Sequence, residues 1–111
     1  MQDLVDSQVS ELRRGALVLS VLSQLHSKQY GYSLQQNLAE KGLDIEQGTL
    51  YPLLRRLDEQ GLLNSEWSVT TSRPRKYYII NDEGKRVFVS LVEEWHKLIQ
   101  TINGLLKVTE S

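Results

Sequence analysis

Cysteine is absent from this sequence, and proline and glycine are scarce, with two and seven residues. Without cysteine there is no disulfide, no thiolate metal ligand and no cysteine nucleophile, which fits a reducing compartment; we expect a cytoplasmic protein. The two histidines, His26 and His96, lie far apart in helical patterns. No metal-binding spacing, nucleophile motif or glycine-rich phosphate loop is present, so we expect neither an enzyme nor a metal or cofactor site.

Long hydrophobic runs and an excess of charge are also missing. The apolar run Ala16–Leu22 follows Asp3 and Glu11. It is too short and wrongly flanked for a signal peptide or a membrane span. The formal net charge is −1, so any argument for nucleic-acid binding must come from where the charges lie. The 111 residues, 40% of them hydrophobic and 24% charged, predict one folded domain with an ordinary core.

Three helices are predicted by apolar residues that recur every three or four positions. The first spans about residues 4–25, with Gly15 placed to bend or divide it. The second follows Gly31 and stops at Gly42, and the third stops at Gly61; glycine suits the left-handed position after a helix end. The inward stripe of the third helix consists of Leu50, Leu53, Leu54 and Leu57.

After the third helix the pattern changes to alternation, which is typical of strands. Leu63, Trp67 and Val69 point one way and predict a half-buried first strand. Residues 76–80 are rich in aromatic and β-branched side chains and predict a second strand. The polar segment 70–75 between them predicts the tip of a β-hairpin.

A last helix is predicted from Asn81, a capping residue, to about Leu106. Asp82 and Glu83 lie in its first turn, where acidic groups favour the positive end of the helix dipole. Its apolar stripe is wider than one neighbouring helix can cover, so we expect it to form a homodimer with a second copy of the chain. The expected dimer contacts are Val87, Leu91, Trp95, Leu98 and Ile102.

The order of these elements predicts a mainly α fold with a small β-hairpin. Three helices and a hairpin make a winged helix-turn-helix DNA-binding domain at residues 1–81. Residues 82–111 make a C-terminal dimerisation helix and tail.

Small, hydroxyl-bearing and basic residues gather on the outer face of the third helix and at the hairpin tip. On the helix, five residues are suited to entering the major groove or contacting phosphates: Gly48, Thr49, Tyr51, Arg55 and Arg56. The flexible tip adds Arg73, Arg75 and Lys76, with no acid nearby, to contact phosphates or a narrow minor groove. Alone, each feature has an ordinary explanation, a solvated helix face or cations that protect an edge strand. Together they favour DNA binding over the alternative, a winged-helix module that contacts an acidic protein.

Several segments resemble the PadR family of transcriptional regulators, in a short form with a single C-terminal helix. They are EQGTLYPLLRRLDEQGLL, SRPRKYYII, NDEGKR, LRRGALVLSVLSQL and YGYSLQQNL. The resemblance implies a repressor that dimerises through its first and last helices and releases DNA when an inducer binds or conditions change. It assigns Thr49, Tyr51 and Arg55 to the recognition helix, and Arg73 and Arg75 to the wing.

Two further expectations follow from a dimer. Two-fold symmetry predicts a pseudo-palindromic operator in double-stranded DNA. Trp95 lies within the apolar stripe of the last helix. One interpretation is that this side chain is simply part of the dimer interface or the core. The resemblance implies a second: in short PadR members an aromatic residue at the dimer centre stacks on planar apolar compounds, which would make Trp95 an effector-binding residue.

Overall fold

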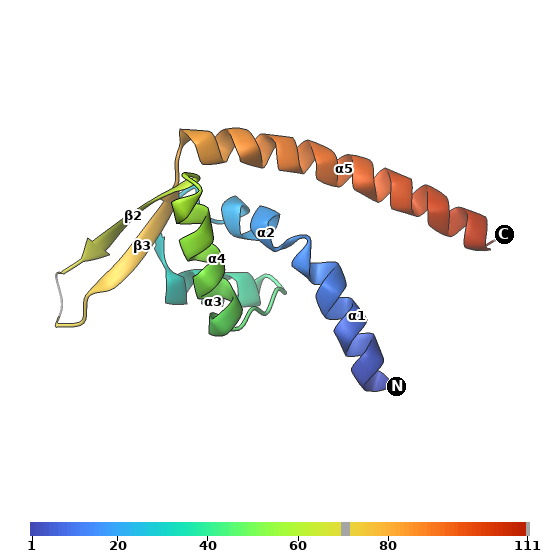
Figure 1. Cartoon of the computed structure of the whole chain (residues 1–111), viewed down its shortest axis with the longest axis horizontal. Coiled ribbons are helices and arrows are strands. Elements are labelled where there is room, and N and C mark those ends of the chain that lie inside the picture. Colours follow the sequence, from blue (N-terminus) through green and yellow to red (C-terminus); the bar gives the residue numbers. More distant parts are fainter. Residues whose placement is uncertain (70–71, 111) are drawn as a thin grey trace.

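The computed structural model describes residues 1–69 and 72–110, the last three of these as backbone only. A β-hairpin projects from a group of short helices at one end, and two helical arms extend toward the other end (Figure 1). In chain order, the elements are α1 (Gln2–Arg14), α2 (Leu17–Ser23), β1 (Gln29–Tyr30), α3 (Gly31–Glu40), α4 (Gln47–Glu59), β2 (Leu63–Ser68), β3 (Arg75–Ile80) and α5 (Asp82–Glu110). The predicted fold class, mainly α with a β-hairpin and a long last helix, is confirmed.

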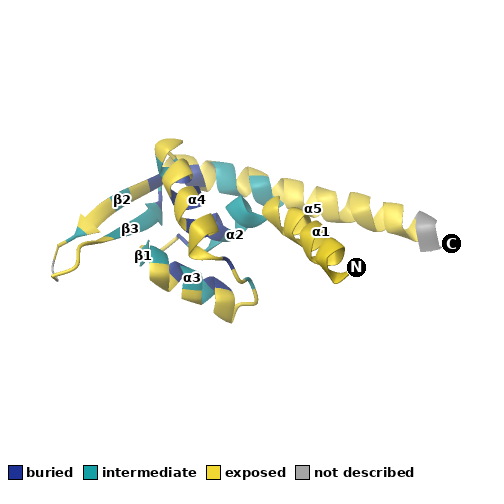
Figure 2. Cartoon of the chain, turned by 60° about the horizontal axis from the view of Figure 1, so that its bottom comes forward, coloured by how far each residue is buried: buried dark blue, intermediate teal, exposed yellow. Residues whose placement is uncertain are grey.

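The first predicted helix is two helices, divided at Gly15 as the sequence suggested. The amide of Ala16 bonds to the carbonyl of Arg13 at 2.9 Å, which tightens the chain into a turn between α1 and α2. Val21 and Leu22 of α2 are fully buried, whereas no residue of α1 is buried. The division therefore separates a helix that belongs to the core from a helix that projects away from it (Figure 2).

The core is formed by the predicted leucine stripes of α2, α3 and α4, closed by one residue from each hairpin strand. Burying each of these side chains contributes about 1.5–3 kcal/mol. Gly42 and Gly61 have φ angles of +98° and +81°, so both predicted left-handed helix ends are confirmed. The buried set is Val21, Leu22, Leu25, Leu34, Leu38, Ile45, Leu50, Leu53, Leu54, Leu57, Leu63 and Ile80.

The hairpin is confirmed, but it belongs to a three-stranded antiparallel sheet of order β1-β3-β2. Its register runs from the pair Leu63 and Ile80 to the pair Ser68 and Arg75. The sequence pattern did not indicate β1, in which Tyr30 pairs with Tyr77. Two residues are too short to show an alternating pattern, so only the fold reveals this strand.

The outer half of the hairpin is more exposed than the alternating pattern suggested. Trp67 is 62% exposed and Val69 is 75% exposed, so the prediction of a half-buried strand is wrong at this end. The reason is that the hairpin extends past the core, and only its base lies over the buried leucines (Figure 2). Residues 70 and 71 of the predicted tip lie outside the described residues.

The start of α5 is joined tightly to the base of the hairpin. Asn81 accepts a hydrogen bond from the Gly84 amide at 2.9 Å, which confirms the predicted cap, and donates one to the Gly61 carbonyl at 3.0 Å. Gly84 is buried, and a Cβ atom there would lie 2.1 Å from the Leu62 carbonyl oxygen. Only glycine allows this close approach, which sets the direction in which α5 leaves the domain.

The two arms give the chain an extended shape. Phe88 and Leu91 pack against the core, but α5 continues past them as part of a 29-residue helix. The radius of gyration is 16.5 Å, whereas a compact domain of roughly this length has about 13 Å. Across the described residues, we find no helix with both the length and the apolar character needed to cross a membrane.

Candidate nucleic-acid interface

A groove of about 460 Å³ separates the third helix of the winged unit, α4, from the hairpin. It brings Tyr51 and Arg55 from α4 together with Arg75 and Lys76 from β3. Four of the eight predicted DNA-binding residues therefore line a single groove. The groove is completed by Tyr30, Gly31, Tyr32, Trp67, Pro74 and Tyr78.

Helix α4 packs against α3 through Tyr51. A Cβ atom on Gly31 would lie 2.5 Å from Cε1 of the Tyr51 ring, so the first residue of α3 must be small to seat this ring. Gly48 and Thr49 lie on the exposed first turn of α4, and a Cβ on Gly48 would meet no other atom within 4 Å. The N-terminal end of α4 is thus open to approach, as a helix that enters a DNA groove requires.

Lys76 has an acidic neighbour that the sequence did not reveal. Its ammonium nitrogen lies 3.5 Å from the carboxylate of Asp58 on α4, which also accepts a hydrogen bond from Ser65 at 2.6 Å. No acid lies near Lys76 in the sequence, but the fold brings one to it from the recognition helix. The structure therefore corrects the expectation of an unpaired cation: Lys76 ties the hairpin to α4.

Arg56 lies apart from the other predicted DNA-binding residues. Successive helical residues point about 100° apart, so Arg56 cannot share the direction of Arg55. It lines a second groove beside Glu94 and Trp95 of α5. Arg56 was expected on the same outer face as Arg55, but it lies toward α5 and away from the hairpin groove.

Arg75 lies over the ring of one tyrosine and belongs to β3 instead of the hairpin tip. It is the first residue of β3, and its guanidinium lies 4.5 Å above the centre of the Tyr30 ring. Tyr30 meets Tyr77 edge to face at 5.9 Å, and the Lys28 ammonium lies 4.7 Å from the centre of the Tyr77 ring. Arg73 lies in the exposed segment before β3. Lys28 and Tyr30 were not among the predicted residues, because their place beside β3 depends on the short strand β1.

Two tyrosines of β3, Tyr77 and Tyr78, keep their protons at physiological pH. A hydrogen bond to Glu66 raises the pKa of Tyr77, and burial raises the pKa of Tyr78, because both favour the neutral phenol. The hydroxyl groups therefore add no negative charge to this surface. Its charge comes from Arg55 and Arg75, and these residues form no ion pair among the described residues.

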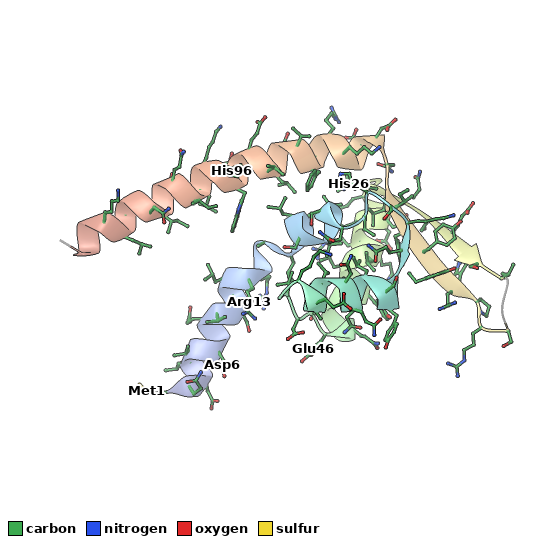
Figure 3. All side chains as sticks on the ribbon, turned by 180° about the vertical axis from the view of Figure 1, so that it is seen from behind. Met1, Asp6, Arg13, His26, Glu46 and His96 are labelled. Atoms are coloured by element: carbon green, nitrogen blue, oxygen red, sulfur yellow. The ribbon has the colours of Figure 1, made fainter. Side chains whose placement is uncertain are left out.

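The second groove, of about 440 Å³, contains several of the predicted dimer residues. Val87 and Leu91 are half-buried and line this groove together with residues of α2 and α4, and Leu98 also lines it. Trp95 forms one wall and is 41% exposed, and Ile102 is 39% exposed further along α5. Figure 3 shows that α1, marked by Met1, Asp6 and Arg13, forms an arm separate from α5, marked by His96.

Helices α2, α3 and α4 with a hairpin packed beside the third define a winged helix-turn-helix protein. Comparison with known sequences places it more narrowly, because the model of the family described as "Transcriptional regulator PadR-like family" matches residues 18–90, more than half of the chain. The chain belongs to the PadR-like family of transcriptional regulators.

Individual relatives agree with this assignment. A PadR family transcriptional regulator from Eggerthella lenta has a solved structure that is 53% identical, covers 95% of this chain and 94% of its own, and superposes with a TM-score of 0.90. A PadR-like transcription factor from Bacteroides fragilis is 36% identical over 89% of this chain and 98% of its own, with a TM-score of 0.75. Transcriptional regulator Rv3488 of Mycobacterium tuberculosis is 37% identical over 76 residues, which are 68% of this chain and 71% of the relative.

Proposed function

We propose that this PadR-like regulator is a cytoplasmic repressor that binds double-stranded DNA in a sequence-specific manner. The observation that carries the proposal is the groove that Arg55 of α4 and Arg75 of β3 both line. In this arrangement α4 enters the major groove with Gly48, Thr49, Tyr51 and Arg55, while the wing reaches phosphates or the adjacent minor groove with Arg73 and Arg75. Arg55 reads a base edge, and the wing supplies affinity.

We further propose that two copies bind together, with residues 1–81 contacting DNA and residues 82–111, together with part of α1, joining the copies. The apolar side chains of α1 and of the outer part of α5 support this, because a single chain leaves them uncovered. An isolated 13-residue helix such as α1 is marginal in water without a packing partner. These exposed side chains are Leu4, Val5, Val9, Leu12, Trp95, Leu98, Ile99, Ile102, Leu105 and Leu106.

Binding to short duplex DNA across a salt series tests the proposed function. A protein that contacts about six to ten phosphates should lose roughly 10³–10⁵ in affinity between about 50 and 200 mM salt, with log affinity falling linearly against log salt. A poly-glutamate chain of matched charge serves as the control for the alternative, a module for an acidic protein partner. Equal affinity for the polyacid and the duplex would reject DNA binding.

Selection of bound genomic fragments should then give a pseudo-palindromic operator, with half-sites roughly 34–36 Å apart.

A small planar apolar effector is the finer part of the proposal, with Trp95 as its contact. The groove beside Trp95 has a volume typical of small-molecule sites and a mainly apolar lining, with Arg56 and Glu94 among the few charged groups. Leu57 of the recognition helix lines the same groove. A ligand in this groove would contact α4 on the side opposite the hairpin. It would lower operator affinity by displacing α4.

Tryptophan fluorescence tests this site in the absence of DNA. Acridine, a planar aromatic probe, should quench the wild type and also Trp67→Phe, in which Trp95 is the remaining tryptophan. Trp95→Ala should lose most of the quenching, because Trp67 is on the hairpin, away from the groove. Equal quenching in the wild type and in Trp95→Ala would remove Trp95 from the site.

A further inference from the structure

Four side chains on one face of the sheet form a stack in which two tyrosine rings lie between two cations. Lys28 lies over Tyr77, Tyr77 meets Tyr30 edge to face, and Arg75 lies over Tyr30. Each contact joins β1 or the residue before it to β3, whose pairing places Tyr30 directly opposite Tyr77. The stack therefore depends on the short strand β1 and would not form in an isolated hairpin.

Arg75, a member of this stack, differs from the neighbouring cation of β3, Lys76, which lies outside it. The charge of Lys76 is satisfied by Asp58, whereas Arg75 rests on a neutral ring. A cation above an aromatic face is attracted by the ring quadrupole but keeps its hydrogen-bond donors available. An arginine on the surface otherwise samples many rotamers, and ordering it on binding costs affinity. The Tyr30 ring reduces that cost because it restricts the guanidinium before DNA arrives.

We propose that Tyr30 is a positioning residue for DNA binding: it holds Arg75 in the direction in which this arginine contacts the DNA backbone. The inference rests on the proposed function and adds a residue from β1 to it. Tyr30 acts through Arg75, so its loss should change affinity without changing the number of phosphates contacted. The Tyr30 hydroxyl has no part in this role, since the ring face makes the contact.

The test compares Tyr30→Leu, Tyr30→Phe, Arg75→Gln and the double variant Tyr30→Leu/Arg75→Gln, on mixed-sequence duplex DNA across a salt series. Tyr30→Leu should weaken binding about three- to tenfold with an unchanged salt slope, because the cation is retained. Tyr30→Phe should bind like the wild type. Arg75→Gln should lower the salt slope by about one unit, and adding Tyr30→Leu to it should have no further effect.

A second measurement follows the contact without DNA. In the free protein the Tyr30 ring should shift the Arg75 side-chain proton resonances upfield, and Tyr30→Leu should abolish this shift while Tyr30→Phe retains it. An equal loss of affinity from Tyr30→Leu with or without Arg75 would overturn the positioning role. If Arg75→Gln weakens binding and Tyr30→Leu does not, the positioning role alone fails. A wild type without salt-dependent DNA binding would remove the proposed function as well.

Discussion

Ile102→Glu is expected to convert the protein into a monomer and to abolish operator binding at micromolar concentration. In a symmetric dimer each substitution occurs twice, so two carboxylates would enter the proposed apolar contact between copies of α5. An unpaired buried charge costs several kcal/mol, enough to dissociate an interface of ordinary strength. A monomer then contacts one half-site, and we expect operator affinity to fall by at least about 10³-fold.

Gln100→Glu is the matched control, because residue 100 lies on the opposite face of α5 from residue 102 and gains the same charge. Sedimentation should show a dimer for the wild type and the control, and a monomer for Ile102→Glu. Helical circular dichroism of the winged unit should remain, since Ile102 lies beyond the part of α5 that packs on the core. A dimeric Ile102→Glu would show that α5 does not join the copies.

Neutralising the wing and neutralising the recognition helix should give two different results. The double variant Arg73→Gln/Arg75→Gln is expected to weaken operator and random duplex by similar factors and to reduce the salt slope by about two units. Arg55→Gln should cost about 1–3 kcal/mol on the operator and relax preference at one base position, with a smaller effect on random duplex. The difference arises because backbone contacts carry no base identity, whereas a bidentate contact to guanine does.

The measurement is the affinity of each variant for both duplexes across a salt series, with the dimer verified by sedimentation. Lys41→Gln is a suitable control, because Lys41 is an exposed cation at the end of α3, bonded to Asn37 and not part of the groove. It should retain wild-type affinity and salt slope. A double wing variant that binds both duplexes as tightly as the wild type, with the same slope, would favour the protein-contact alternative.

Much of the fold could be predicted because its signals are local. The leucine stripe of α4 and the glycines at positions 42 and 61 report on helix faces and helix ends, and both follow from spacing alone. The cap by Asn81 is local in the same sense. Strand β1 could not be predicted, because a two-residue strand exists only through its pairing with β3.

The candidate site could be predicted only in outline. Tyr51, Arg55 and Arg75 were expected to act together, and the groove brings them together. The pairing of Lys76 with Asp58 joins β3 to α4 and depends on how the hairpin packs, which no periodicity encodes. The direction of Arg56 depends likewise on where α5 lies. Contacts between elements therefore decide which cations remain available to DNA, and the sequence pattern identifies only the candidates.

The joint at Gly84 sets a mechanical limit on the proposed dimer. Asn81 caps α5, and Gly84 packs closely against the Leu62 carbonyl. The orientation of α5 relative to the winged unit is therefore restricted. Two copies joined through α5 would then hold their two α4 helices at a fixed separation and a fixed relative rotation. One inserted base pair between half-sites moves the second site by about 3.4 Å and turns it by roughly 34–36° around the duplex. A rigid dimer cannot follow that turn. The number of base pairs between the half-sites therefore becomes a recognition element in its own right.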